Sequence, residues 1–174
     1  ENDLLISLGG IVTATDADGD LVTAAAGGLV INVDDDTPTA SAALLTGTVD
    51  EDGVGGGIAG GIGDVAGAAT IASGSVSSLF NSGADAPLTY ALSLTTVATL
   101  TALNLTSAGT ALTYSVAGDI VTASANGGAV FTFQLTAAGA WTFTLIDQLD
   151  HAQGADENDL LISLGGIVTA TDAD

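Results

Sequence analysis

The chain contains no lysine, no arginine and no cysteine among its 174 residues, and its one histidine is His151. Its 21 acidic residues therefore give a net charge of −21. Nucleic-acid-binding proteins need lysine or arginine to neutralise phosphates, and anionic membrane surfaces repel an acidic chain. The composition disfavours nucleic-acid binding, membrane binding and phosphoryl-transfer enzymes that depend on a cationic anchor.

Disulfides and membrane helices are excluded in the same way. Without cysteine no disulfide can form, and secreted proteins without disulfides often use metal ions instead. The strictly apolar runs are only a few residues long, whereas a membrane helix needs about 18. Alanine, valine, leucine and isoleucine alternate with threonine and serine, a composition typical of strands, and no stretch has a sustained helical period.

The chain does contain a perfect repeat. The first eighteen residues, ENDLLISLGGIVTATDAD, recur as the last eighteen, so that Glu1 matches Glu157 at an offset of 157 − 1 = 156 positions. This identity predicts one period of a tandem array, cut in the middle of a module. Arrays of near-identical copies provide length or multiplicity more often than a single chemical reaction.

Short strands separated by turn sequences account for most of the chain. A hairpin is predicted at the N-terminus, where residues 4–15, kinked at Gly9-Gly10, and residues 21–33 flank the turn DADGD. Residues 51–63 are glycine-rich and predict a loop. Further strands are predicted at 39–50, 69–80, 88–94, 112–116, 120–125, 130–135, 141–145 and 160–171.

These strands predict an all-β fold, an immunoglobulin-like antiparallel β-sandwich. A barrel fits less well, because a tandem module needs two opposite poles. The clearest hairpin joins residues 130–135 to 141–145, with one face directed to the core. That face comprises Phe131, Phe133, Leu135, Trp141, Phe143 and Leu145. The alternation in residues 88–94 likewise places Leu88, Tyr90, Leu92 and Leu94 on one face.

The acidic sequence DDDTP at residues 34–38 predicts a boundary between modules. Residues 1–36 then form the C-terminal hairpin of the preceding repeat, and residues 37–174 form one module that lacks its last strand, the counterpart of 21–33. Five residues span at most about 18 Å, whereas ten-residue strands are roughly 33 Å long. If the poles are opposite, docking of the hairpin on another molecule, head to tail, is favoured.

Several motifs, in order, resemble the long repeats of giant calcium-dependent adhesins that bacteria export by type I secretion (RTX adhesins). The motifs are TDADGD at 15–20, TPTASA after VDDD, VDE at 49–51, LTYSVAGDIVTA at 112–123 and VFTFQLTAAGAWTFTLIDQLDHA at 130–152. The resemblance implies immunoglobulin-like modules that bind Ca²⁺ at and between modules. It also implies an extracellular extender that holds a distal ligand-binding domain away from the cell surface in adhesion and biofilm formation.

The acidic residues favour the same metal. Eighteen of the 21 lie in tight groups at the ends of apolar runs, where carboxylates repel one another unless a cation screens them. Oxygen ligands select hard ions, and flexible loops with many ligands favour Ca²⁺ over Mg²⁺. The candidate ligands are Asp16, Asp18, Asp20, Asp34, Asp35, Asp36, Asp50, Glu51, Asp52, Asp172 and Asp174. Whether groups 34–36 and 50–52 share an ion is open at this point.

Enzymatic alternatives find little support. His151 near Asp147 and Asp150 suggests a catalytic triad, but no nucleophile motif such as GxSxG is present. Gly55, Gly57 and Gly60 match GxGxxG without a βαβ setting. Paired acids suggest a glycosidase, which also needs an aromatic-lined cleft. We therefore expect a protein that is not an enzyme.

Two functions are consistent with these features. The first is a structural extender module stiffened by Ca²⁺, with neighbouring repeats as its partners. The alternative is a Ca²⁺-dependent ligand-binding module, or a self-associating one that exchanges strands in a filament. Ions ringed by protein at strand ends favour the extender, whereas an ion with open coordination in a cleft favours ligand binding.

Overall fold

The computed structural model describes residues 3–55, 69–152 and 159–173, and its regular structure is almost entirely β. Every strand pair is antiparallel. The predicted all-β class is confirmed. Most of the predicted glycine-rich loop, including Gly57 and Gly60, lies outside the described residues.

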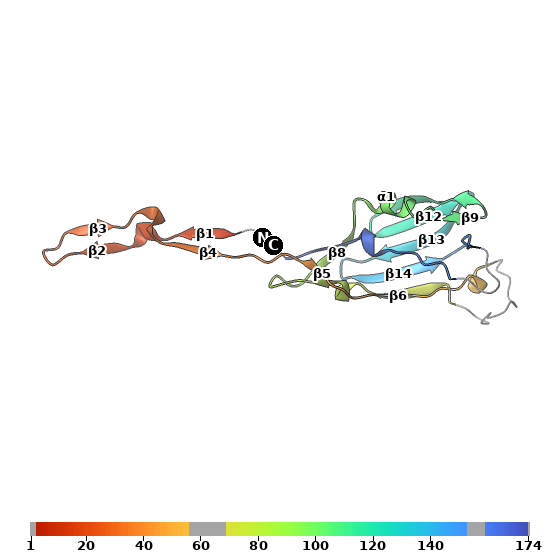
Figure 1. Cartoon of the computed structure of the whole chain (residues 1–174), viewed down its shortest axis with the longest axis horizontal. Coiled ribbons are helices and arrows are strands. Elements are labelled where there is room, and N and C mark those ends of the chain that lie inside the picture. Colours follow the sequence, from red (N-terminus) through yellow and green to blue (C-terminus); the bar gives the residue numbers. More distant parts are fainter. Residues whose placement is uncertain (1–2, 56–68, 153–158, 174) are drawn as a thin grey trace.

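The elements follow one another as short strands joined by turns and single-turn 3₁₀ helices (Figure 1). The strands are β1 (Leu4–Ser7), β2 (Thr13–Thr15), β3 (Leu21–Thr23), β4 (Val30–Val33), β5 (Thr39–Ala40), β6 (Ile71–Ser75), β7 (Phe80–Asn81), β8 (Thr89–Leu92), β9 (Thr106–Ser107), β10 (Thr110–Ala111), β11 (Thr113–Ala117), β12 (Ile120–Ala125), β13 (Gly128–Leu135), β14 (Ala140–Leu145) and β15 (Val168–Thr171). The helices are α1 (Thr96–Thr101) and the 3₁₀ turns η1 (Gly9–Ile11), η2 (Ala26–Gly28), η3 (Glu51–Gly53), η4 (Ser77–Leu79) and η5 (Gly165–Ile167).

The body of the molecule is built on one five-stranded sheet in the order β11-β12-β13-β14-β6. The predicted central hairpin is confirmed, with Phe131 opposite Leu145, Phe133 opposite Phe143 and Leu135 opposite Trp141. Alternation along β13 and β14 places these side chains on one face, where Phe131 stacks on Phe143 at a centroid distance of 5.0 Å. The intervening threonines and Gln134 are partly exposed.

A second group of elements packs against the buried cluster of this sheet. It comprises β8, α1 and the C-terminal segment with η5 and β15, and it contributes Tyr90, Leu100 and Ile167 to the same buried cluster as the sheet. Leu100 and Ile167 have no exposed surface. β15 pairs with β8, with Val168 opposite Leu92 and Thr171 opposite Thr89. The C-terminal copy of the repeat is thus part of the core.

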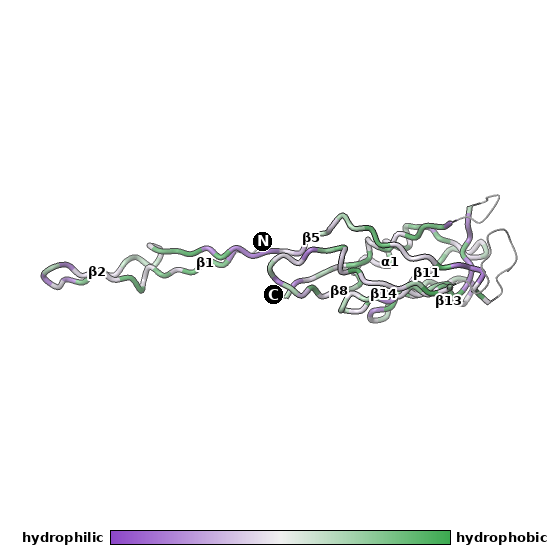
Figure 2. The backbone as a smooth tube through the Cα atoms, turned by 90° about the horizontal axis from the view of Figure 1, so that it is seen from below, coloured by the Kyte–Doolittle hydropathy of each residue, from purple (hydrophilic) through white to green (hydrophobic). Residues whose placement is uncertain are grey.

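The N-terminal hairpin lies outside this body. β1 pairs with β4 and β2 with β3, as predicted, and the long ribbon projects from one end of the molecule (Figure 1). Apolar and polar residues follow one another along the ribbon, and its tip is hydrophilic (Figure 2). Docking of this hairpin on another molecule stays a prediction.

Four strand predictions were wrong in detail. Residues 39–50 contain only the two-residue β5, because the Ser41 hydroxyl accepts a hydrogen bond from the Ala43 N–H and turns the chain. The predicted strand 69–80 is shorter, since η4 follows β6. The predicted strand 160–171 is reduced to β15. Leu94 is fully exposed, not on the buried face, because β8 ends at Leu92.

Helix α1 was not predicted because six residues are too few for a helical period to show. Its first turn is organised by Ser93, whose hydroxyl accepts from the Thr95 N–H at 3.2 Å and whose carbonyl accepts from the Thr96 N–H at 3.1 Å. Thr96 and Leu100, four positions apart, are the two buried residues of this helix. None of the helices in the described part of the chain is long and apolar enough to span a membrane.

Candidate metal sites

The turn DADGD forms the tip of the projecting hairpin, between β2 and β3. The Asp16 N–H donates to the Asp20 carbonyl at 3.0 Å, closing the turn. Oδ1 of Asp16 accepts hydrogen bonds from the N–H groups of Gly19 at 3.1 Å and Asp20 at 2.9 Å. Gly19 has a φ of +102°, which glycine adopts readily, so this position closes the turn without steric strain.

Asp16, Asp18 and Asp20 bring their carboxylates together at this tip. Each offers a ligand atom within 4.8 Å of the others, and all three side chains are exposed. The hydrogen bond from the Asp18 side chain, followed by that from the Asp20 backbone, lowers the pKa of the Asp16 carboxyl. The group could hold a metal ion, and its all-oxygen donors suit a hard cation.

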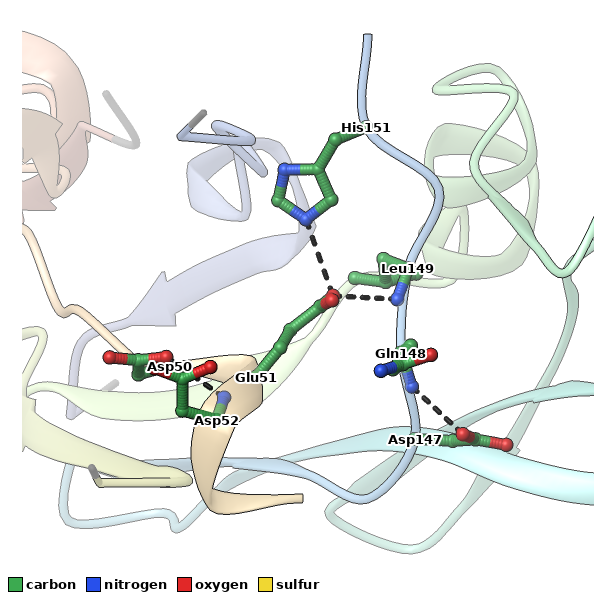
Figure 3. Close-up of polar contacts among 7 residues, drawn as sticks. All are labelled: Asp50, Glu51, Asp52, Asp147, Gln148, Leu149 and His151. Atoms are coloured by element: carbon green, nitrogen blue, oxygen red, sulfur yellow. Dashed lines mark hydrogen bonds and ion pairs between the residues drawn. The ribbon is translucent and has the colours of Figure 1, made fainter. Parts of the chain in front are cut away.

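The group Asp50–Asp52 has a different role, at the end of the sheet where β14 leads into the following loop (Figure 3). Asp50 caps η3, since its Oδ1 accepts from the Asp52 N–H at 2.9 Å. Oε1 of Glu51 accepts from the Leu149 N–H at 2.7 Å and lies 3.2 Å from Nε2 of His151. Glu51 thus connects two segments about one hundred positions apart in the sequence.

The group Asp34–Asp36 lies at the opposite end of the sheet, where the hairpin joins the body (Figure 1). Oδ1 of Asp34 accepts from the Asn32 side chain at 2.6 Å. Oδ2 of Asp36 accepts from the Ala84 N–H at 3.1 Å, in the turn before β8. The structure therefore separates this group from Asp50–Asp52, and one ion cannot bind to both.

Asp172 follows β15 and is partly buried, whereas Asp174 lies outside the described residues. By the repeat, Asp172 corresponds to Asp16 of the hairpin tip. Among the described residues, only Asp16, Asp18 and Asp20 place three carboxylates within 4.8 Å of one another. Metal binding at Asp34, Asp35, Asp36, Asp50, Glu51, Asp52, Asp172 and Asp174 stays a prediction.

One acidic contact was missed in the sequence. Oδ2 of Asp150 accepts from the Gly109 N–H at 2.8 Å, and the Thr106 side chain is the first cause of its lowered pKa, followed by the Gly109 backbone. Ala108 and Gly109 both have positive φ, the geometry of a tight hairpin turn between β9 and β10. The acid thus fixes a turn 41 positions away, a distance that no local motif signals.

Comparisons of this chain with models of protein families, with curated proteins and with solved structures give no match. The case for its function therefore rests on the repeat, the charge and the geometry described above.

Proposed function

We propose that this chain is one period of a tandem array in a secreted, cell-surface adhesin of the RTX type, where it acts as an extender module. The observation that carries the proposal is the perfect repeat at an offset of 156 positions. Its C-terminal copy is packed into the body, and its N-terminal copy projects as a ribbon from one end. This is the arrangement expected when the repeated segment closes the body of one module and its other copy belongs to the module before it.

The fold within this proposal is an immunoglobulin-like β-sandwich with an incomplete second sheet. The five-stranded sheet is one layer, and β8 with β15 is the beginning of the other. Residues 37–174 form the module, and residues 1–36 belong to the module before it. Adhesion and biofilm formation would then depend on a ligand-binding domain elsewhere in the same protein.

Ca²⁺ is the proposed ion, and the tip carboxylates Asp16, Asp18 and Asp20 are its best-supported ligands. They are clustered, made only of oxygen donors, and lie in a chain that has no lysine or arginine to neutralise them. In an array, this tip lies in the closing segment of one module, close in sequence to the boundary at residues 34–38. The tip lies at the end of the ribbon away from the body (Figure 1), so bound Ca²⁺ would remove carboxylate repulsion at the tip and stiffen the hairpin itself.

Calorimetric titration with Ca²⁺ tests this assignment directly. We expect a dissociation constant of roughly 10⁻⁴–10⁻³ M, as in extracellular calcium modules. The triple variant Asp16→Asn, Asp18→Asn, Asp20→Asn should lose this binding. A control with Asp3→Asn, Asp119→Asn and Asp159→Asn removes the same three charges elsewhere and should bind as the wild type does. If both variants bound Ca²⁺ with the same affinity, Ca²⁺ would act only as a diffuse counterion, and the assignment of a site at the tip would be wrong.

Stability provides a second measurement. An ion that binds only the folded state stabilises it by about 1.4 kcal/mol at ten times its dissociation constant. Because the tip projects from the body, hydrogen exchange of the hairpin amides reports this effect more directly than a melt of the whole chain. Protection should rise with Ca²⁺ and fall with chelator at the Ala24 amide, which donates to the Val12 carbonyl at 2.9 Å, and at the Asp16 amide, which donates to the Asp20 carbonyl at 3.0 Å.

One observation favours the alternative, a Ca²⁺-dependent binding module. All three tip carboxylates are exposed, so an ion held there would keep positions open to an external ligand. Ca²⁺-dependent retention of the wild type on a glycan array, lost in the tip variant and kept in its control, would support ligand binding.

A further inference from the structure

The two copies of the repeat have complementary surroundings. Ile11 in the hairpin is 78% exposed, whereas its counterpart Ile167 is completely buried in the body. For the glycines the close contacts are in the hairpin copy and not in the body. A Cβ on Gly9 would collide with the Ala25 and Ala26 carbonyls of the hairpin, whereas nothing lies within 4 Å of one on Gly165. Each copy thus fills a contact that the other leaves open.

The backbone edges show the same division. In the hairpin, the Val12 carbonyl accepts from the Ala24 N–H at 2.9 Å, so the even-numbered residues of β2 point to β3. In the body, the Ile167 carbonyl accepts from the Ser93 N–H at 2.8 Å, so the odd-numbered residues of β15 point to β8. Because the offset of 156 positions is an even number, odd-numbered residues of one copy correspond to odd-numbered residues of the other. Partners β3 and β8 therefore use opposite edges of one strand sequence.

We propose that the hairpin 3–33 of a second copy of this chain docks on β8 and α1 in place of residues 159–172, with Ile11 in the position of Ile167. The known pairing of β15 sets the register: Thr13 would lie opposite Ala91 and Thr15 opposite Thr89. The edge of β2 that would face β8 is the edge that β3 leaves unpaired. This interface rests on the two copies alone, and neither calcium binding nor adhesion is needed for it.

Exchange of the shared sequence changes little in free energy, because the same side chains enter the same positions. The gain comes from β3 and β4, which remain paired to the docked strands and would line the open edge of the body. Their large apolar side chains are exposed in the single chain, an arrangement that favours association. These residues are Leu21, Val22, Val30, Ile31 and Val33, with Leu29 just before β4.

The chain's own C-terminal segment competes with this docking. It is tethered, so its effective concentration is in the millimolar range expected for short links. A competing minor state is populated at about 0.1–10%, and the apparent affinity falls by that fraction. We therefore expect the wild type to be mainly monomeric, with weak head-to-tail association at high concentration.

The same substitution in the two copies should have opposite effects. Ile167→Asp expels the C-terminal segment and should raise the apparent association constant about 10- to 1,000-fold, the inverse of the minor-state population. Ile11→Asp should abolish the weak association of the wild type, because a carboxylate cannot enter the buried position. Sedimentation velocity over a concentration series, in chelator and in Ca²⁺, measures both, so failure of the calcium site leaves this test intact.

Two further variants keep the test decisive. The double variant Ile11→Asp, Ile167→Asp has lost the C-terminal segment from its body, and its hairpin cannot dock. It should stay monomeric, whereas non-specific aggregation would persist in it. Leu161→Asp changes a side chain of the C-terminal segment that is 92% exposed and should behave as the wild type does. A monomeric Ile167→Asp variant, or equal association of the double variant, would overturn the proposal. The proposal would also be overturned if Ile167→Asp weakened association while Ile11→Asp left it unchanged. That result would mean that a strand of the second copy pairs beside β15 and does not replace it.

Discussion

Single carboxylates in this protein accept hydrogen bonds from backbone N–H groups, two of them 48 and 41 positions away in the sequence. The chain has no lysine or arginine, so acids satisfy N–H groups instead, as Asp16, Asp36 and Asp150 do. An ion pair joins Glu51 to His151 at 3.2 Å. Hydrogen bonds to the ionised form of a carboxyl lower its pKa, as they do at Asp16 and Asp150, so folding should become sensitive to acid at these two residues.

Asp150→Asn should lower the melting temperature at neutral pH, because a neutral amide holds the Gly109 N–H less well. The folded pKa of Asp150 lies below its ordinary value of 3.8. Its contribution is therefore complete above the unfolded pKa and is lost as pH falls through the folded pKa. The difference from wild type should shrink below pH 3.8 and disappear in stronger acid. Asp3→Asn, which makes the same charge change at an exposed residue, is the control, and a pH-independent difference would contradict this account.

At the scale of elements, the pair β6–β14 depends on a large residue placed against glycine. Gly74 lies opposite Trp141, and a Cβ on Gly74 would lie 2.9 Å from the indole Nε1. A Cβ on Gly47 would lie 2.8 Å from the ring's other end. The indole is thus held between two glycines and stacks on Phe133 at a centroid distance of 6.4 Å, so it has little room to move.

Gly74→Ala should destabilise the protein by about 1–3 kcal/mol, the usual cost of overpacking. Gly128→Ala is the matched control in β13, because the nearest atom to its Cβ is the Ala125 carbonyl oxygen at 4.0 Å. The control should be neutral or slightly stabilising, since alanine restricts the unfolded chain. Urea unfolding followed by Trp141 fluorescence measures both, and equal stability of the two variants would show that the indole shifts freely.

The whole molecule has a net charge of −21 and few positively charged groups to offset it. Self-repulsion of this kind destabilises the compact state, and dissolved salt screens it over about 10 Å at 0.1 M. Salt should therefore stabilise this protein, whereas it destabilises proteins held together by surface ion pairs. The response to salt is therefore a property of the whole chain rather than of any one site.

Sodium chloride, with excess chelator present, should raise the melting temperature continuously. The control is the same titration at about pH 3, below the ordinary pKa values of Asp and Glu, where most carboxyls are protonated and the net charge and hence the salt effect should be small. Ca²⁺ added at constant ionic strength should produce a further increase in hairpin protection. A melting temperature that falls with salt would mean that attractive charge pairs dominate.

The sequence predicted the elements with strong local signals and missed those that depend on distant partners. Period-two alternation predicted the β13–β14 hairpin and its core face, and the turn DADGD with its flanking strands predicted the N-terminal ribbon. The tip cluster followed from carboxylates at alternate positions around Gly19. By contrast, Ser41, in an expected strand, donates its hydroxyl to the Ser78 carbonyl 37 positions away, and the contacts of Glu51 and Asp150 cross about 100 and 41 positions.

The sequence by itself determined the all-β class, the excess negative charge and the repeat, because alternation, composition and identity are local or countable. Only the tertiary structure decided that Asp34–Asp36 and Asp50–Asp52 lie at opposite ends, and that one copy of the repeat is core and the other is surface. Two identical segments of eighteen residues cannot differ in intrinsic preference. Ile167 is buried and Ile11 exposed because β8 and α1 lie beside one copy and not beside the other.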